Sequence, residues 1–183
     1  MAKFEIKNGV AVIPEGTTTI GFGAFGDCSS LQSITIPEGV TEIGECAFED
    51  CSSLQSITIP EGVTEIGASA FRGCSSLQSI TIPESVKAIG CGAFSKISSL
   101  QSIVIPKGVK KIEEFAFKGC AALTTITLPI GVNKIDEGAF TECEALTTIY
   151  VPAKKTDYYK QRLPEKLHSL IVELQPEKKP NKK

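Results

Sequence analysis

Apolar residues recur at a fixed interval of 23 residues along this chain. The stretch CSSLQSITIPEGVTEIG occupies residues 28–44 and returns unchanged at 51–67. The prolines follow the same interval: Pro14, Pro37, Pro60, Pro83, Pro106, Pro129 and Pro152. So do the phenylalanines: Phe25, Phe48, Phe71, Phe94, Phe117 and Phe140. A constant period of this length predicts a solenoid in which each repeat forms one coil.

Each coil contains two short extended patterns. In Ser33-Ile34-Thr35-Ile36, polar and β-branched apolar residues alternate, which predicts a half-buried strand that Pro37 ends. Val40 and Ile43 then predict a second extended segment on the opposite wall, and Gly44 suits a turn with positive φ. We therefore expect an α/β-type repeat solenoid whose seven proline-terminated strands form one parallel sheet along one wall.

The two ends of the repeat array need covers because a single coil cannot bury its own apolar side chains. We expect residues 1–9 to form an N-terminal edge strand or cap, with Phe4 and Ile6 shielding the first coil. The solenoid itself spans residues 10–152, which contain six 23-residue intervals. Residues 153–174 form a C-terminal cap with a short helix, for which Thr156 is the predicted N-cap and Pro164 the end. The basic residues 175–183 are expected to be a disordered tail.

The consensus C-x-x-L-x-x-I-x-I-P-x-x-V-x-x-I-G-x-x-A-F, together with the ending Ile149-Tyr-Val-Pro-Ala153, resembles the BspA-like, or Treponema-type, leucine-rich repeats. The resemblance implies a right-handed leucine-rich-repeat superhelix without enzymatic activity. It also implies a role in protein binding or adhesion, commonly on bacterial surfaces, with a host or extracellular-matrix protein as partner. The near-identity of two coils leaves an alternative open, in which the chain is a structural spacer or a consensus-engineered array with no natural ligand.

Charge and hydropathy exclude two classes of partner. The formal net charge is −2, which gives no global attraction to nucleic acid. Residues 1–94 carry four Lys/Arg and eleven Asp/Glu, whereas residues 95–183 carry fifteen and ten, so one half is acidic and the other basic. The N-terminal sequence has no apolar run typical of a signal peptide, and no segment approaches the ~20 apolar residues that would insert into a membrane. The cellular location and the oligomeric state stay open.

Cysteine and histidine give no pattern of a catalytic or metal site. One row of the repeat holds Cys28, Cys51, Cys74, Cys120 and Cys143, with Ile97 at the remaining position. Replacement by an apolar residue is typical of a buried row, and zinc sites need short paired spacings instead. Cys46 and Cys91 lie outside the row, and His168 has no partner at a motif spacing. We expect no catalytic residues, no metal and no cofactor.

The outward positions of the proline-terminated strands form the candidate binding surface. They carry short hydroxyl side chains that a regular strand ladder would hold rigidly, so that little entropy is lost on contact. The predicted partner-binding residues are Ser33, Thr35, Ser56, Thr58, Ser79, Thr81, Ser102, Val104, Thr125, Thr127, Thr148 and Tyr150. Tyr150 is expected to be an exposed aromatic. The opposite wall, with Glu42 and Glu65 followed by Lys111 and Lys134, is expected to serve solubility.

Overall fold

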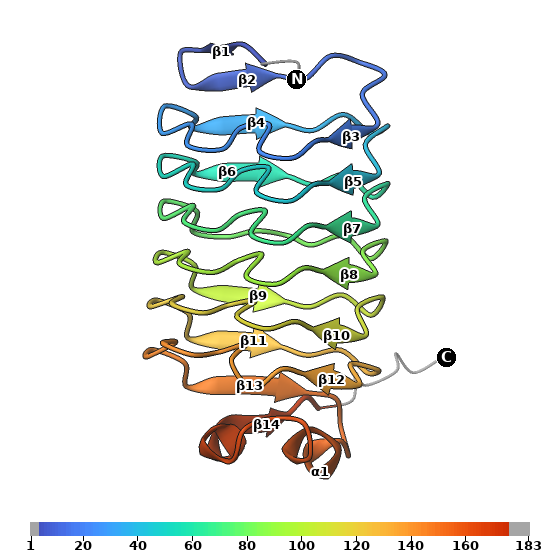
Figure 1. Ribbon diagram of the computed structural model, residues 1–183. Coiled ribbons are helices and arrows are strands. Elements are labelled where there is room, and N and C mark those ends of the chain that lie inside the picture. Colours follow the sequence, from blue (N-terminus) through green and yellow to red (C-terminus); the bar gives the residue numbers. More distant parts are fainter. Residues whose placement is uncertain (1–3, 176–183) are drawn as a thin grey trace, which may run out of the picture.

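The computed structural model describes residues 4–175. It is a β-solenoid of about seven coils of ~23 residues, stacked so that the chain passes between two walls in every coil (Figure 1). The predicted solenoid and its period are confirmed. The α/β label is too loose, because helix in the described residues is limited to α1 (Thr156–Lys160) and the 3-10 helix η1 (Glu165–Leu170), both after the last coil.

The first wall, which we call the sheet wall, carries the proline-terminated strands. Its first sheet contains β1 (Ile6–Lys7), β2 (Val10–Val12), β4 (Ser33–Thr35) and β6 (Ser56–Thr58). Its second sheet contains β9 (Ser102–Val104), β11 (Thr125–Thr127), β13 (Thr148–Val151) and β14 (Ile171–Glu173). Pairing is parallel except for β1, which pairs antiparallel with β2 at the N-terminal edge. The prediction of one continuous sheet is wrong, since residues 79–81 belong to no strand.

The opposite wall is continuous. It is one parallel sheet of β3 (Thr19–Ile20), β5 (Glu42–Ile43), β7 (Glu65–Ile66), β8 (Ala88–Ile89), β10 (Lys111–Ile112) and β12 (Lys134–Ile135). Partners are 23 residues apart in register, as in Ile43↔Ile66 and Ile66↔Ile89. The predicted second extended segment is therefore confirmed.

The core between the walls consists of ladders of identical side chains. The phenylalanines of successive coils stack nearly parallel, with centroids 5.1 Å apart for Phe25–Phe48 and 5.7 Å apart for Phe117–Phe140. Phe4 extends this stack by packing on Phe25 at 4.9 Å, which supports its predicted capping role. Each coil thus completes the burial of its neighbours.

Glycines at the Gly44 position serve close packing of coils and not a left-handed turn. Gly44, Gly67 and Gly90 have no positive φ, which corrects our expectation. A Cβ at Gly67 would lie 2.5 Å from the Glu45 amide nitrogen, and one at Gly90 would lie 2.4 Å from that of Ala68. The backbones of adjacent coils therefore approach too closely for a side chain. The left-handed positions lie two residues later, for example at Cys46 and Ser69.

The C-terminal cap packs two tyrosines against the last coils. Tyr159 is buried and its hydroxyl donates to the Pro129 carbonyl, while the Tyr158 hydroxyl donates to that of Val132 at 2.9 Å. The predicted N-cap is wrong, because Lys155 holds that position and Thr156 is the first helical residue. The Thr156 hydroxyl instead donates to the Glu173 carboxylate at 2.8 Å. The predicted tail lies outside the described residues except for Gln175.

Candidate protein-binding surface on the sheet wall

The predicted surface residues form two rows on the outer face of the sheet wall. Parallel pairing sets Ser33 beside Ser56 and Thr35 beside Thr58, and the same register aligns Thr127 with both Val104 and Tyr150. In each strand, the isoleucine between the two outward residues points into the core, as Ile34 and Ile126 do. The strand alternation predicted from the sequence therefore places ten of the twelve residues on one face, and Ser79 and Thr81, which belong to no strand, are exposed on either side of the buried Ile80.

These residues are not equally accessible. Thr35, Thr58, Thr81 and Val104 are exposed, and so are Ser56, Ser79 and Ser102. The half-buried members are Ser33, Thr125, Thr127, Thr148 and Tyr150. The expectation of an exposed Tyr150 is wrong, because β14 adds one more strand to the sheet and sets Val172 beside the tyrosine. The accessible part of the rows thus runs from Thr35 to Val104.

Two exposed apolar residues that we did not predict extend the Thr35 row at its ends. Val12 pairs with Thr35 at the start of the row, and Val172 pairs with Tyr150 at its end. Val12 was detectable because it lies two residues before Pro14, as Thr35 lies before Pro37. Val172 was not detectable by the repeat, since β14 follows the cap helices and no proline ends it.

The sheet wall opens at the coil that contains Ser79–Thr81. The Gln101 amide lies 3.4 Å from the Gln78 carbonyl, whereas the equivalent bond from Gln55 to Gln32 measures 2.9 Å. Ile57 beside the opening retains 9 % exposure, but Ile126 further along is fully buried. A hollow of about 390 Å³ lies here, lined by residues 79–84, 102–104, Glu61 and Pro106.

Ser85 gives a physical reason for this opening. The strand sequence SITIP at 79–83 is identical to those at 33–37 and 56–60, so the strand itself is not the cause. Two residues later, however, Ser85 replaces a glycine of the repeat. A Cβ at the equivalent Gly108 would lie 2.4 Å from the carbonyl oxygen of the preceding coil. At Ser85, whose hydroxyl donates to the Val63 carbonyl at 2.6 Å, we infer that the side chain holds the two coils apart.

A second hollow of about 360 Å³ adjoins the first and is apolar. Val104, Ile130 and Leu174 line it and are 62 %, 58 % and 40 % exposed. Pro129, Pro152 and Ala153 are further lining residues, and Glu84 and Val104 border both hollows. Apolar side chains gathered on a surface in this way are typical of interaction sites.

One row beside the hollows changes from acidic to apolar along the solenoid. The position after each strand proline is occupied by Glu15, Glu38, Glu61, Glu84, Lys107, Ile130 and Ala153 in turn. No ion pair to any of the four carboxylates occurs within residues 4–175. Glu84 accepts a hydrogen bond from the Lys107 backbone amide, at 3.1 Å. We call these four residues the carboxylate ladder.

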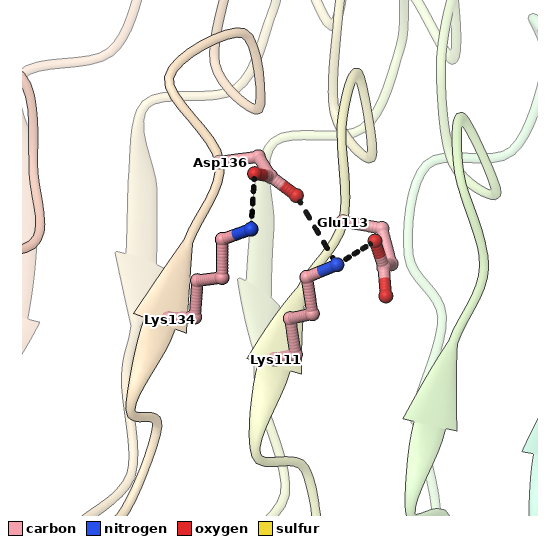
Figure 2. A network of polar contacts seen from close by, with 4 residues as sticks. All are labelled: Lys111, Glu113, Lys134 and Asp136. Carbon is pink, nitrogen blue, oxygen red and sulfur yellow. Dashed lines mark hydrogen bonds and ion pairs between the residues drawn. The ribbon is translucent and has the colours of Figure 1, made fainter.

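The opposite wall neutralises its own charges in the second half of the solenoid. Figure 2 shows Lys111 between Glu113 and Asp136, and Lys134 pointing toward Asp136. The Lys134 ammonium lies 3.2 Å from the Asp136 carboxylate. Glu113 and Asp136 occupy the Gly44 row, so the residues that break the glycine row are the ones that pair with the lysines. The charges of these four residues are therefore already paired within the wall.

The cysteine row is structural. Cys51, Cys74 and Cys120 are buried, and each thiol donates to the phenylalanine carbonyl 26 residues earlier, at 3.0–3.1 Å. Burial raises the pKa of Cys51 and of Cys120 to about 12. Cys28 and Cys143 are only half-buried, so the expectation that the whole row is buried fails at both ends, where fewer coils cover the thiols.

The remaining candidate chemistry also lacks a site. Cys91 is exposed, but partial burial and the carboxylate of Glu114 raise its pKa, which opposes an activated thiolate. His168 contacts the Leu163 carbonyl at 3.0 Å. Within the described residues, no three or more His, Cys, Asp or Glu side chains gather in a way that could hold a metal ion. Residues 4–175 also contain no helix long and apolar enough to cross a bilayer.

Comparison with solved structures finds leucine-rich repeat proteins. TpLRR, the T. pallidum leucine-rich repeat protein, is 34 % identical over 87 % of this chain and 80 % of its own, with a TM-score of 0.75. A leucine-rich cell surface protein of Faecalibacterium prausnitzii is 28 % identical, with a TM-score of 0.57, over 90 % of this chain but 59 % of its own. The pneumococcal vaccine antigen PcpA shares the fold, with a TM-score of 0.80 at 23 % identity, over 92 % of this chain and 42 % of its own.

Comparison of the sequence with family models identifies the repeat itself. No curated protein matches the chain. The model of the BspA type leucine-rich repeat region, which comprises six copies, matches residues 5–106 and 64–164. Together these matches cover nearly all of the coils and part of the cap. The chain belongs to the BspA-type leucine-rich repeat family.

Proposed function

We propose that this chain is a non-enzymatic scaffold that binds another protein through its sheet wall. The observation that carries the proposal is the pair of adjoining hollows, where the wall opens and Val104 and Ile130 are exposed. A spacer needs only uniform polar rows, and a break of this kind gives it no benefit. Leucine-rich repeat proteins generally act as interaction scaffolds, which supports the same conclusion.

We further propose that the partner is met at a cell surface, in the manner of adhesion. This part of the proposal rests on the printed description of the F. prausnitzii relative as a cell surface protein. The partner class to test first is therefore extracellular-matrix protein.

The test measures binding of the purified chain to immobilised extracellular-matrix proteins. The measurement is then repeated with variants substituted on each wall. Thr81→Arg combined with Val104→Arg should abolish binding and leave the melting temperature nearly unchanged, because both side chains are exposed. The matched control is Glu42→Arg combined with Glu65→Arg on the opposite wall, which should change mainly the association rate and its salt dependence. Loss of binding in the control pair alone would show that the docking wall is wrong. Absence of any captured protein would favour the spacer.

A further inference from the structure

The two hollows form one continuous groove beside the strand ends, and the last two residues of the carboxylate ladder line it. The ladder runs along the first four coils, and its last two members, Glu61 and Glu84, line the first hollow. The second hollow begins at Glu84 and continues past Val104 to Ile130 and Leu174. The groove therefore runs across the strands, with carboxylates at one end and carbon atoms at the other.

The acidic end of the groove is complementary to a positively charged partner. Neighbouring strands lie ~4.8 Å apart, so the four carboxylates form a row of like charge. None of them has an ion pair in the part of the chain that the structure describes. This row is therefore free to attract a cationic partner, whereas carboxylates such as Glu113 are already paired with a lysine of the chain.

The other end of the groove is complementary to an apolar side chain. Ile130 and Leu174 leave carbon surface open to water around a hollow of about 360 Å³, enough for one large aliphatic or aromatic side chain. Covering this surface is favourable in proportion to the apolar area removed from water. Lys107, which separates the two ends, opposes a cation placed directly at the apolar hollow.

The spacing fixes the order of these groups in a partner. Glu84 and Ile130 are two coils apart in the same row, or about 10 Å at ~4.8 Å per strand. An extended polypeptide advances ~3.3 Å per residue and its side chains alternate between two sides, so the residue four positions from the one at Ile130 faces the groove between Glu84 and Glu61. Resting on the function proposed above, we propose that the groove binds an extended polypeptide segment with a basic residue four positions from a large apolar residue.

The probe is a fluorescein-labelled peptide with the sequence Lys-Lys-Ser-Ser-Leu flanked by serines, titrated with the full chain and followed by fluorescence anisotropy. We expect saturable binding that weakens as salt is raised through 0.05–0.5 M. Replacing the peptide leucine by serine should weaken binding about tenfold or more. Replacing both lysines by glutamate should abolish it.

Substitutions in the chain assign the two ends of the groove. Ile130→Ser combined with Leu174→Ser should reproduce the loss caused by the leucine-free peptide, whereas Val12→Ser, an exposed valine far along the same wall, should have no effect. Glu61→Gln combined with Glu84→Gln, the two carboxylates that line the first hollow, should weaken binding and flatten its salt dependence. Glu42→Gln combined with Glu65→Gln on the opposite wall is the charge-matched control.

Three outcomes would overturn this inference. They are failure of the peptide to bind, binding that is indifferent to the Ile130 and Leu174 substitutions, and equal effects of the two glutamine pairs. A second copy as occupant would appear as dimerisation in sedimentation velocity that Ile130→Ser abolishes, with no peptide binding. If the peptide did not bind but Thr81→Arg combined with Val104→Arg still abolished capture of a protein partner, the proposed function would be supported. Only the proposal of a basic and apolar peptide segment would then be refuted.

Discussion

Replacing one phenylalanine inside the stack should cost more than replacing one at its end. Phe71 stacks on two rings, at 5.2 Å and 5.6 Å, whereas Phe140 stacks on one, at 5.7 Å. A buried aromatic pair contributes about 0.5–1.5 kcal/mol beyond its buried area, and a near-isosteric apolar exchange by itself costs about 1 kcal/mol. Phe71→Leu should therefore lower the free energy of unfolding by about 2–4 kcal/mol, and Phe140→Leu by about 1.5–2.5 kcal/mol.

Double substitutions separate stacking from simple burial. Phe71→Leu with Phe94→Leu removes three stacked pairs, although the single variants remove two each, so the double variant should be less destabilised than the sum by about 0.5–1.5 kcal/mol. Phe48→Leu with Phe94→Leu removes four pairs and should be additive. Urea unfolding followed by far-UV circular dichroism gives these energies, since the chain has no tryptophan. Additivity in the adjacent pair, or equal coupling in both pairs, would refute the role of the stack.

Three further outcomes follow from the coil register, the thiols and the opening. Deletion of residues 51–73 should leave a shorter folded solenoid and deletion of 51–60 should unfold the chain; equal thermal melts for both would contradict the 23-residue register. Burial raises the pKa of Cys51 and of Cys120 from about 9 in the unfolded chain to about 12 in the folded chain. Because only the unfolded chain loses these protons above pH 9, the free energy of unfolding should fall from pH 9 upward. That fall in urea midpoints should be smaller in a Cys51→Ala, Cys120→Ala variant, and an unchanged slope would argue against buried thiols. Ser85→Gly should close the wall and slow hydrogen exchange in residues 77–83, whereas unchanged exchange would show that the serine is not the cause.

The 23-residue period was sufficient to predict the features that every coil shares. The inward rows, the strand before Pro37 and the outward face of Ser33 and Thr35 all follow from alternation within 23 residues. The stacked phenylalanines and the buried centre of the cysteine row follow in the same way. These features depend on local sequence and on a neighbour of nearly identical sequence.

Features that depend on the distance between coils could not be predicted from one coil. We predicted a turn with positive φ at the row of Gly44. The sequence does not distinguish a glycine that is needed for positive φ from a glycine that is needed because a neighbouring backbone leaves no room for a side chain. The break at Ser79–Thr81 occurs in a segment whose sequence is unchanged, and the nearest departure from the repeat is Ser85, which contacts the coil before it. Tyr150 is covered by β14, which carries no repeat signal.

If Ser85 is the wedge that we infer, the position of a hollow on such a solenoid can move without any change in the core. Every coil has a residue in the same row, and the neighbouring coils hold Gly62 and Gly108 there. Exchanging serine and glycine between coils would shift the opening by one strand spacing at a time. The buried ladders would remain as they are. Repeats of this kind therefore separate two properties that most folds couple, because the residues that make the protein fold differ from the few that decide where its surface opens.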